Sequence, residues 1–146
     1  MEEKINRLQN NLSLIRTSAG WSASELGAKL DLSRQMISNL ENGRNKMTVI
    51  QYRAIRNVLD EEIDRSAAED DTQMLKDVIR VLVDEPESFT EEQRNQVLSD
   101  AKLLAPSVAA KKTTRKKASM TWAALAGTVV AGAAMAITTT FLGNKD

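Results

Sequence analysis

The stretch of sequence that decides the fold is WSASELGAKLDLSRQMISNLENG, residues 21–43. It is dense in signals that begin and end helices. Ser22 and Glu25 have the spacing of a capping box, in which each side chain bonds the main-chain N–H of the other residue. Ser33 is placed to cap a second helix, and Gly43 to end that helix in the left-handed conformation. The stretch therefore predicts two short helices joined by a tight turn, at about residues 23–30 and 34–42.

The second of these helices has two faces of different chemistry. Ile37 and Leu40 share one face and are predicted to be buried. The other face carries hydrogen-bonding side chains: Arg34, Gln35, Ser38, Asn39 and Asn42. Arginine can bond guanine bidentately, and glutamine or asparagine can bond adenine. This face therefore has the groups that recognise base edges in the major groove of DNA.

With caps, core and glycine at this spacing, the chain resembles the Cro/C1-type, or XRE-family, helix-turn-helix domains. The matching elements are S-x-x-E-L, L-x-L-S-R-Q-x-I-S and L-E-N-G, and the resemblance covers about residues 5–63. It implies an all-α, five-helix domain that binds palindromic operators in double-stranded DNA as a dimer. A generic helical bundle, and a helix-turn-helix domain that binds protein instead of DNA, are the alternatives.

The resemblance also implies roles for individual residues. Base contacts are implied for Arg34, Gln35, Ser38 and Asn39. Contacts to the DNA backbone are implied for Ser22, Ser33, Asn42, Arg44 and Lys46. Arg16 and Glu41 match a structural salt bridge of the family. Two positions depart from the pattern, because Ala23 replaces a DNA-contacting glutamine and Asp31 replaces the turn glycine, where it must adopt a left-handed conformation.

Apolar periodicity predicts the rest of this domain, residues 1–65. A first helix from Glu3 to Ala19 would bury Ile5, Leu8, Leu12 and Ile15. Thr48 and Gln51 form another capping box. The helix that follows would bury some combination of Val49, Tyr52, Ile55 and Leu59, with Ile63 in a fifth helix that closes the domain.

Residues 72–105 are predicted to form a helical hairpin. Leu75, Val78, Ile79 and Leu82 make its first apolar face, Pro86 lies at the break, and Thr90 with Gln93 caps the second helix. That helix presents Val97, Leu98, Ala101 and Leu104. Two helices this short are marginal alone, so the hairpin must dock on something, and dimerisation is its predicted role.

The C-terminal part consists of a basic stretch followed by an uncharged, apolar stretch. Residues 107–119 are predicted to be a flexible linker with five cations: Lys111, Lys112, Arg115, Lys116 and Lys117. Residues 121–142 then carry no charge, and as a helix they would span about 33 Å, the thickness of a hydrocarbon core. Trp122 and Phe141 lie near the two ends, where interfacial aromatic residues are common. A transmembrane helix over 120–142 is therefore predicted, and a soluble Ala-rich oligomerisation helix or a disordered tail are the alternatives.

The charge distribution supports this division into parts. Residues 1–65 have a net charge of +1, residues 66–110 of −6 and residues 111–146 of +5. By the positive-inside rule the basic linker stays in the cytoplasm, which predicts a single-pass inner-membrane protein with a cytoplasmic N-terminal domain. The basic cluster is read as a topology signal that attracts anionic lipid, with a non-specific DNA clamp or a solvated linker as alternatives.

The chain has no Cys and no His, which excludes disulfides, Cys/His zinc sites and histidine bases. No metal ligand set, phosphate loop or nucleophile–base pair is present, so no cofactor and no enzymatic activity are predicted. The predicted function is a dimeric bacterial transcription regulator, a repressor, anchored to the membrane. The alternative is a membrane-anchored scaffold whose helix-turn-helix domain binds a cytoskeleton-like protein partner.

Overall fold

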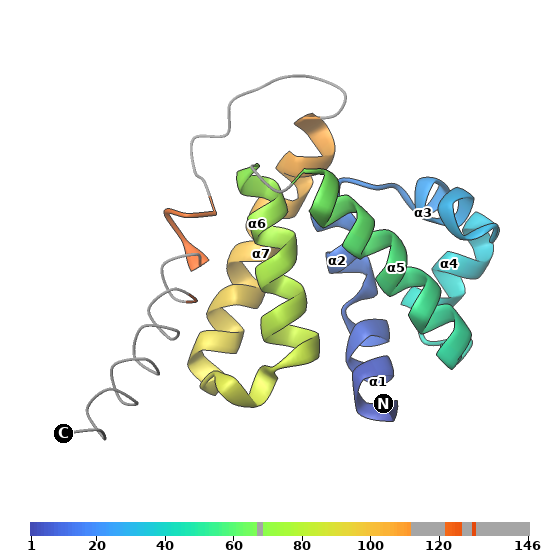
Figure 1. The fold of residues 1–146 in the computed structure, drawn as a ribbon, viewed down its shortest axis with the longest axis horizontal. Helices are drawn as coiled ribbons and strands as arrows, with labels where there is room; N and C mark the ends of the chain where they lie inside the picture. The colour runs from blue at the N-terminus through green and yellow to red at the C-terminus, as the bar shows by residue number, and fades with distance from the viewer. Residues whose placement is uncertain (67–68, 112–121, 127–129, 131–146) are drawn as a thin grey trace.

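A computed structural model describes residues 1–66, 69–111, 122–126 and 130. The described part of the chain is helical (Figure 1). Five helices form its N-terminal part: α1 (Glu2–Asn10), α2 (Leu12–Ser18), α3 (Ala23–Leu30), α4 (Arg34–Glu41) and α5 (Val49–Arg65). A hairpin follows, made of α6 (Asp70–Ile79), a π-helical turn η1 (Arg80–Asp84), a 3-10 turn η2 (Pro86–Ser88) and α7 (Glu91–Lys111).

The predicted helix caps are confirmed. Ser22 Oγ accepts a hydrogen bond from the main-chain N–H of Glu25 at 3.0 Å, and Glu25 Oε1 accepts one from the main-chain N–H of Ser22 at 3.4 Å. The capping box of Thr48 and Gln51 is also complete. The box of Thr90 and Gln93 begins α7 in the same way. These local bonds explain why helices begin where the sequence predicts, since each box satisfies main-chain donors that a helix N-terminus leaves free.

Two helix boundaries differ from the prediction. The first helix is broken at Asn11, whose backbone leaves the helical region at φ −110° and ψ 10°. Its side-chain amide donates to the carbonyl oxygen of Arg7 at 2.8 Å, in addition to the main-chain bond between the same two residues at 3.2 Å. The last two predicted helices are instead one, because α5 runs unbroken through Ile63. The domain still has five helices over residues 1–65, but they are divided at different places from those predicted.

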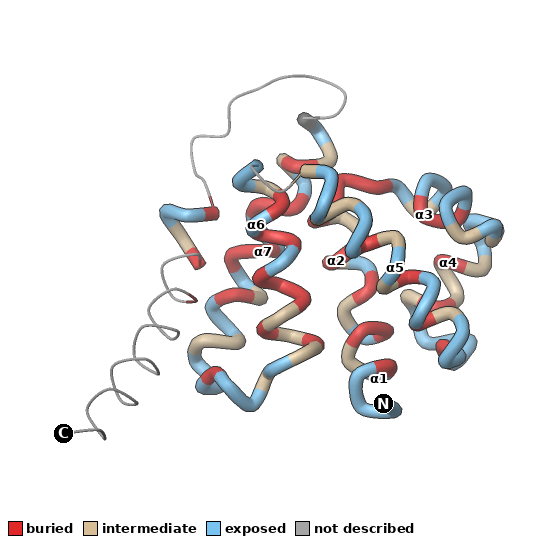
Figure 2. The backbone as a smooth tube through the Cα atoms, viewed as in Figure 1, coloured by how far each residue is buried: buried red, intermediate tan, exposed pale blue. Residues whose placement is uncertain are grey.

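The hairpin packs on the N-terminal helices (Figure 1). Both parts contain buried residues (Figure 2), and the side chains of these residues form one core. α7 lies against α2, and α6 lies against α2 and α5. Two arginines fasten the η1 turn, since Arg7 Nε donates to the carbonyl oxygen of Val83 at 2.8 Å and Arg56 forms a bidentate ion pair with Asp84 at 2.5 and 2.9 Å. The hairpin therefore docks within its own chain.

The second helix of the hairpin is longer than predicted. α7 continues through Pro106 to Lys111, so residues 107–111, predicted to be linker, are helical. Val97, Ala101 and Leu104 are buried as predicted, and Val108 extends the buried side into the added turn. The remainder of the predicted linker, residues 112–119, lies outside the described residues.

The predicted transmembrane helix, residues 120–142, lies mostly outside the described residues. No helix in the described ranges combines the length and the apolar character that a bilayer crossing requires. Of the predicted span, the structure describes residues 122–126 and 130, and there Trp122, Ala126 and Val130 are buried against the rest of the protein.

Candidate DNA-binding face

A tight turn sets the angle between α3 and α4. Asp31 adopts the left-handed conformation at φ 56° and ψ 41°, which confirms the prediction for this position. The main-chain N–H of Leu32 donates to the carbonyl oxygen of Gly27 at 2.8 Å. A Cβ atom on Gly27 would lie 2.5 Å from the carbonyl oxygen of Leu32, well inside van der Waals contact. The turn can therefore close this tightly because residue 27 has no side chain.

The buried face of α4 holds the helix in place. Ile37 and Leu40 are fully buried, as predicted from their spacing. Ser33 caps the helix by accepting a hydrogen bond from the main-chain N–H of Met36 at 3.1 Å. The opposite side, called here the α4 polar face, consists of Arg34, Gln35, Ser38, Asn39 and Asn42. Because the buried face is rigidly packed, the polar face has a fixed direction.

Within the α4 polar face, side chains bond one another along the helix. Gln35 Nε2 donates to Asn39 Oδ1 at 3.0 Å, and Asn42 Nδ2 donates to Ser38 Oγ at 3.4 Å. Arg34 and Gln35 are exposed, while Ser38 and Asn39 are half-buried. The structure thus brings together the four side chains for which base contacts are predicted. Their contact with bases stays a prediction.

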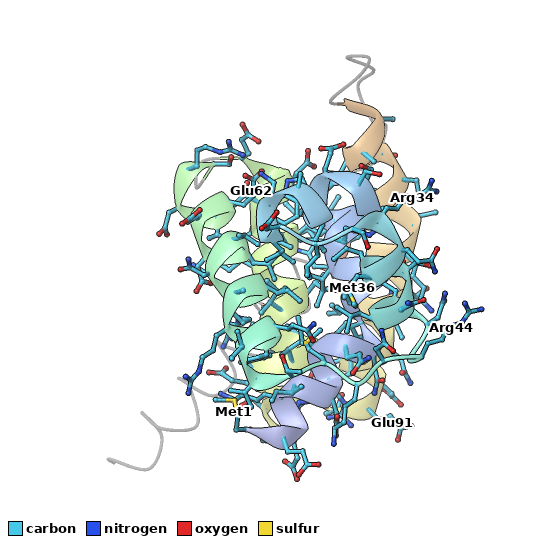
Figure 3. All side chains as sticks on the ribbon, turned by 90° about the vertical axis from the view of Figure 1, so that its right-hand side faces the viewer. Met1, Arg34, Met36, Arg44, Glu62 and Glu91 are labelled. Carbon is cyan, nitrogen blue, oxygen red and sulfur yellow. The ribbon has the colours of Figure 1, made fainter. Side chains whose placement is uncertain are left out.

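The residues with predicted DNA-backbone contacts lie at the two ends of α4 and beside α3. Ser33 and Asn42 flank α4, and Arg44 and Lys46 follow it in an exposed loop. Arg34 and Arg44 point outward along one edge of the molecule (Figure 3). Ser22 is exposed, although its hydroxyl is already engaged in the α3 capping box.

The cations of this edge differ in their partners. Lys46 Nζ lies 3.3 Å from Glu2 Oε1, and both side chains are exposed. Among the residues that the structure describes, no carboxylate forms an ion pair with Arg34 or Arg44. These two guanidinium groups therefore provide charge that a phosphate could neutralise and hydrogen-bond donors that guanine could accept.

Gln9 is a structural residue of this site that the sequence did not reveal. Its buried amide Nε2 donates to the carbonyl oxygens of Leu40 at 2.9 Å and Asn45 at 2.7 Å. Its Oε1 accepts a bond from the main-chain N–H of Met47 at 2.9 Å. One side chain of α1 thus fixes the end of α4 and the loop that carries Arg44 and Lys46. No spacing rule singles out one glutamine on an amphipathic helix.

The predicted salt bridge between Arg16 and Glu41 is present. Arg16 Nε and Nη2 lie 2.5 and 3.2 Å from the two carboxylate oxygens of Glu41, and Nη1 donates to the carbonyl oxygen of Trp21 at 2.8 Å. Both side chains are mostly buried. Arg16 therefore links α2 to Trp21, just before α3, and to Glu41 at the end of α4. Glu41 does not belong to the polar face.

Residues 7–65 match the family described as helix-turn-helix. This part of the chain is an XRE-family helix-turn-helix domain, the class of DNA-binding domain that occurs in transcription regulators. No curated protein and no solved structure matches the chain. For the residues after position 65, any role must therefore be inferred from the structure and the sequence themselves.

Proposed function

We propose that the chain is a sequence-specific transcription repressor, with no enzymatic activity, that binds a palindromic operator as a homodimer. The observation that carries this proposal is the α4 polar face. Its arginine and amide side chains lie on the side of α4 opposite Ile37 and Leu40 and have the donors and acceptors that base edges recognise. Repression follows if the bound domain occupies DNA that the transcription machinery requires.

Dimerisation is proposed because one domain with a net charge of only +1 has little net positive charge with which to bind a single half-site strongly. Two domains on a palindrome double both the base contacts and the phosphate contacts. The inner faces of α6 and α7 are used within the chain, so a dimer formed through residues 72–105 would use their outer faces. Leu103 on α7 is 60% exposed and offers an apolar contact there.

We further propose that residues 120–142 anchor the protein in the inner membrane, with the helix-turn-helix domain in the cytoplasm. The uncharged segment has the length of a bilayer crossing, and the basic cluster precedes it directly. The same cluster would attract anionic lipid headgroups. The protein would then search DNA close to the membrane surface.

The proposal is tested by selecting bound duplexes from a random pool with the full chain in detergent. The expected result is a palindromic motif, and Gln35→Ala should relax the base preference at one position of each half-site. If the selected duplexes share no sequence motif after repeated rounds of selection, sequence-specific binding would be contradicted. Crosslinked-DNA sequencing of the membrane fraction would then test whether discrete sites are occupied from the membrane.

A second function, as a membrane-anchored scaffold, is favoured by one observation. Met1, Val49 and Ile50 are exposed apolar side chains at the N-terminal ends of α1 and α5, and Ile50 is 79% exposed. Contiguous exposed apolar patches mark sites that bind proteins, membranes or ligands. Recovery of a filament protein with the full chain, lost in Ile50→Asp and accompanied by no enrichment of DNA, would favour this function over repression.

A further inference from the structure

The start of the C-terminal apolar segment lies against the hairpin (Figure 1). Trp122, Ala126 and Val130 are spaced four residues apart and are all buried, Trp122 with 1% of its surface exposed. Ala123 and Ala124, between them, are exposed. Burial with this spacing means that one side of the segment faces protein.

Two acidic residues of α6 fix Trp122. Its main-chain N–H donates to Asp70 Oδ2 at 2.9 Å, and its indole Nε1–H donates to Asp77 Oδ2 at 2.8 Å. Asp70 and Asp77 are seven residues apart, which places them two turns apart on the same side of α6. The contact thus has a defined register, which an unspecific hydrophobic contact would lack.

Asp77 depends on this contact more than Asp70 does. Asp77 as a whole residue is 4% exposed, and Gln73 Nε2 donates to its other carboxylate oxygen at 2.9 Å. Within the described part of the chain, no lysine or arginine pairs with Asp77. A buried carboxylate requires hydrogen-bond donors to be tolerated. The Trp122 indole supplies one of the two donors, and when Trp122 leaves, water must replace it.

We propose that the Asp70–Asp77 side of α6 is a receptor for the first turns of the C-terminal segment, and that a lipid bilayer competes with it for Trp122. The inference rests on the membrane anchor proposed above. Trp122 cannot be buried against α6 and also lie in the headgroup region of a bilayer, where an interfacial tryptophan is stable. Docking and insertion therefore exclude each other, and the docked state covers part of the apolar segment before a membrane is reached.

The test uses the full chain with Trp21→Phe, so that Trp122 is the single tryptophan. Without lipid, Trp122 fluorescence should be blue-shifted and protected from acrylamide. On addition of vesicles of phosphatidylcholine and phosphatidylglycerol that contain brominated lipid, its emission should be quenched as it moves into the bilayer. Asp77→Ala should increase acrylamide access without lipid and raise vesicle partitioning about tenfold, the factor that one hydrogen bond to a charged group is typically worth.

Asp100→Ala is the matched control. Asp100 is also a buried carboxylate, and it also accepts its bonds from a glutamine four residues earlier, Gln96, but it has no bond to Trp122. Its partitioning should stay within about twofold of the parent chain, because a single mutation that leaves the contact intact leaves the competition unchanged. Trp122→Phe, followed by flotation, is a second variant that keeps an aromatic ring but removes the indole donor together with the five-membered ring, and like Asp77→Ala it should raise vesicle partitioning.

The outcomes separate the two proposals. If Trp122 is as accessible in the parent chain as in Asp77→Ala without lipid, the receptor does not exist. If the chain floats with vesicles while Trp122 remains protected from brominated lipid, docking and insertion do not compete. If no variant binds vesicles but Asp77 still protects Trp122 from acrylamide, both the membrane anchor and the proposed competition with the bilayer are wrong. The docking contact between Trp122 and α6 is then still supported.

Discussion

Replacing Gln9 with alanine tests how the recognition helix is held. The side chain is buried and makes three hydrogen bonds, all to main-chain groups of residues 40–47. A typical protein hydrogen bond contributes about 1 kcal/mol net, so the variant should lose about 3 kcal/mol in the free energy of unfolding. Asn10→Ala, an exposed neighbour on the same helix, should change it by less than about 0.5 kcal/mol.

The assay is urea unfolding of the full chain in mild detergent, followed by circular dichroism. The loop that carries Arg44 and Lys46 should loosen as well, so DNA affinity should fall even at temperatures where the variant stays folded. If Gln9→Ala lowers the free energy of unfolding by less than about 1 kcal/mol, with the same slope against urea concentration as the parent chain, the three bonds do not stabilise the fold as expected. It would mean that water replaces the amide at all three main-chain groups.

Three further predictions concern the turn, the hairpin and the charged edge. Gly27→Val should lower the free energy of unfolding by at least about 2 kcal/mol, because the Cβ of the valine would meet the Leu32 carbonyl oxygen. Ala28→Val, at an exposed position of the same helix, should lower it by well under half of that, and thermal unfolding measures both variants. Arg56→Ala should cost about 1–2 kcal/mol by loosening the η1 turn. The side-chain hydrogen bond to Asp84 raises the pKa of Arg56, so this contribution is fully present at neutral pH and, as pH rises, is lost when strongly alkaline pH deprotonates the guanidinium; a loss between pH 6 and 9 would contradict it. Arg44→Ala should weaken binding to all duplexes alike and lower the salt dependence by about one phosphate contact, and a change in base preference would show that Arg44 reads bases instead.

The helix-turn-helix was predictable from sequence because its signals are local. Each capping box involves residues three apart, and Asp31 occupies a turn position that few residue types tolerate. The buried face of α4 follows from the helical period alone. Such features are encoded within one or two helical turns, so they do not depend on distant parts of the chain.

Contacts between distant segments were not predictable in the same way. The bonds from Gln9 reach 31 to 38 residues along the chain, and Arg7 reaches 76 residues to Val83. Their partners are main-chain carbonyl and N–H groups, which every residue type carries. From the sequence we could predict that the hairpin packs against another surface. We could not predict that this surface is formed by the N-terminal helices of the same chain. The bond between Trp122 and Asp77 is of the same long-range kind.

The break at Asn11 and the unbroken α5 show the same limit on a smaller scale. Apolar spacing runs smoothly through residues 5–15, so the period predicts one helix, but the backbone of Asn11 leaves the helical region and divides it. In α5 no capping signal separates Leu59 from Ile63, and the helix simply continues.

The central claim is that the α4 polar face reads base sequence, and the most direct test is the ratio of affinities for a selected site and a scrambled duplex of equal length. The ratio should fall by about tenfold or more in Arg34→Ala plus Gln35→Ala, because each bidentate base contact contributes about 1–3 kcal/mol of discrimination. Lys102→Ala, exposed on α7, removes one positive charge as Arg34→Ala does and should leave the ratio unchanged. An equal loss of affinity for both duplexes in the double variant, with the ratio preserved, would contradict the claim.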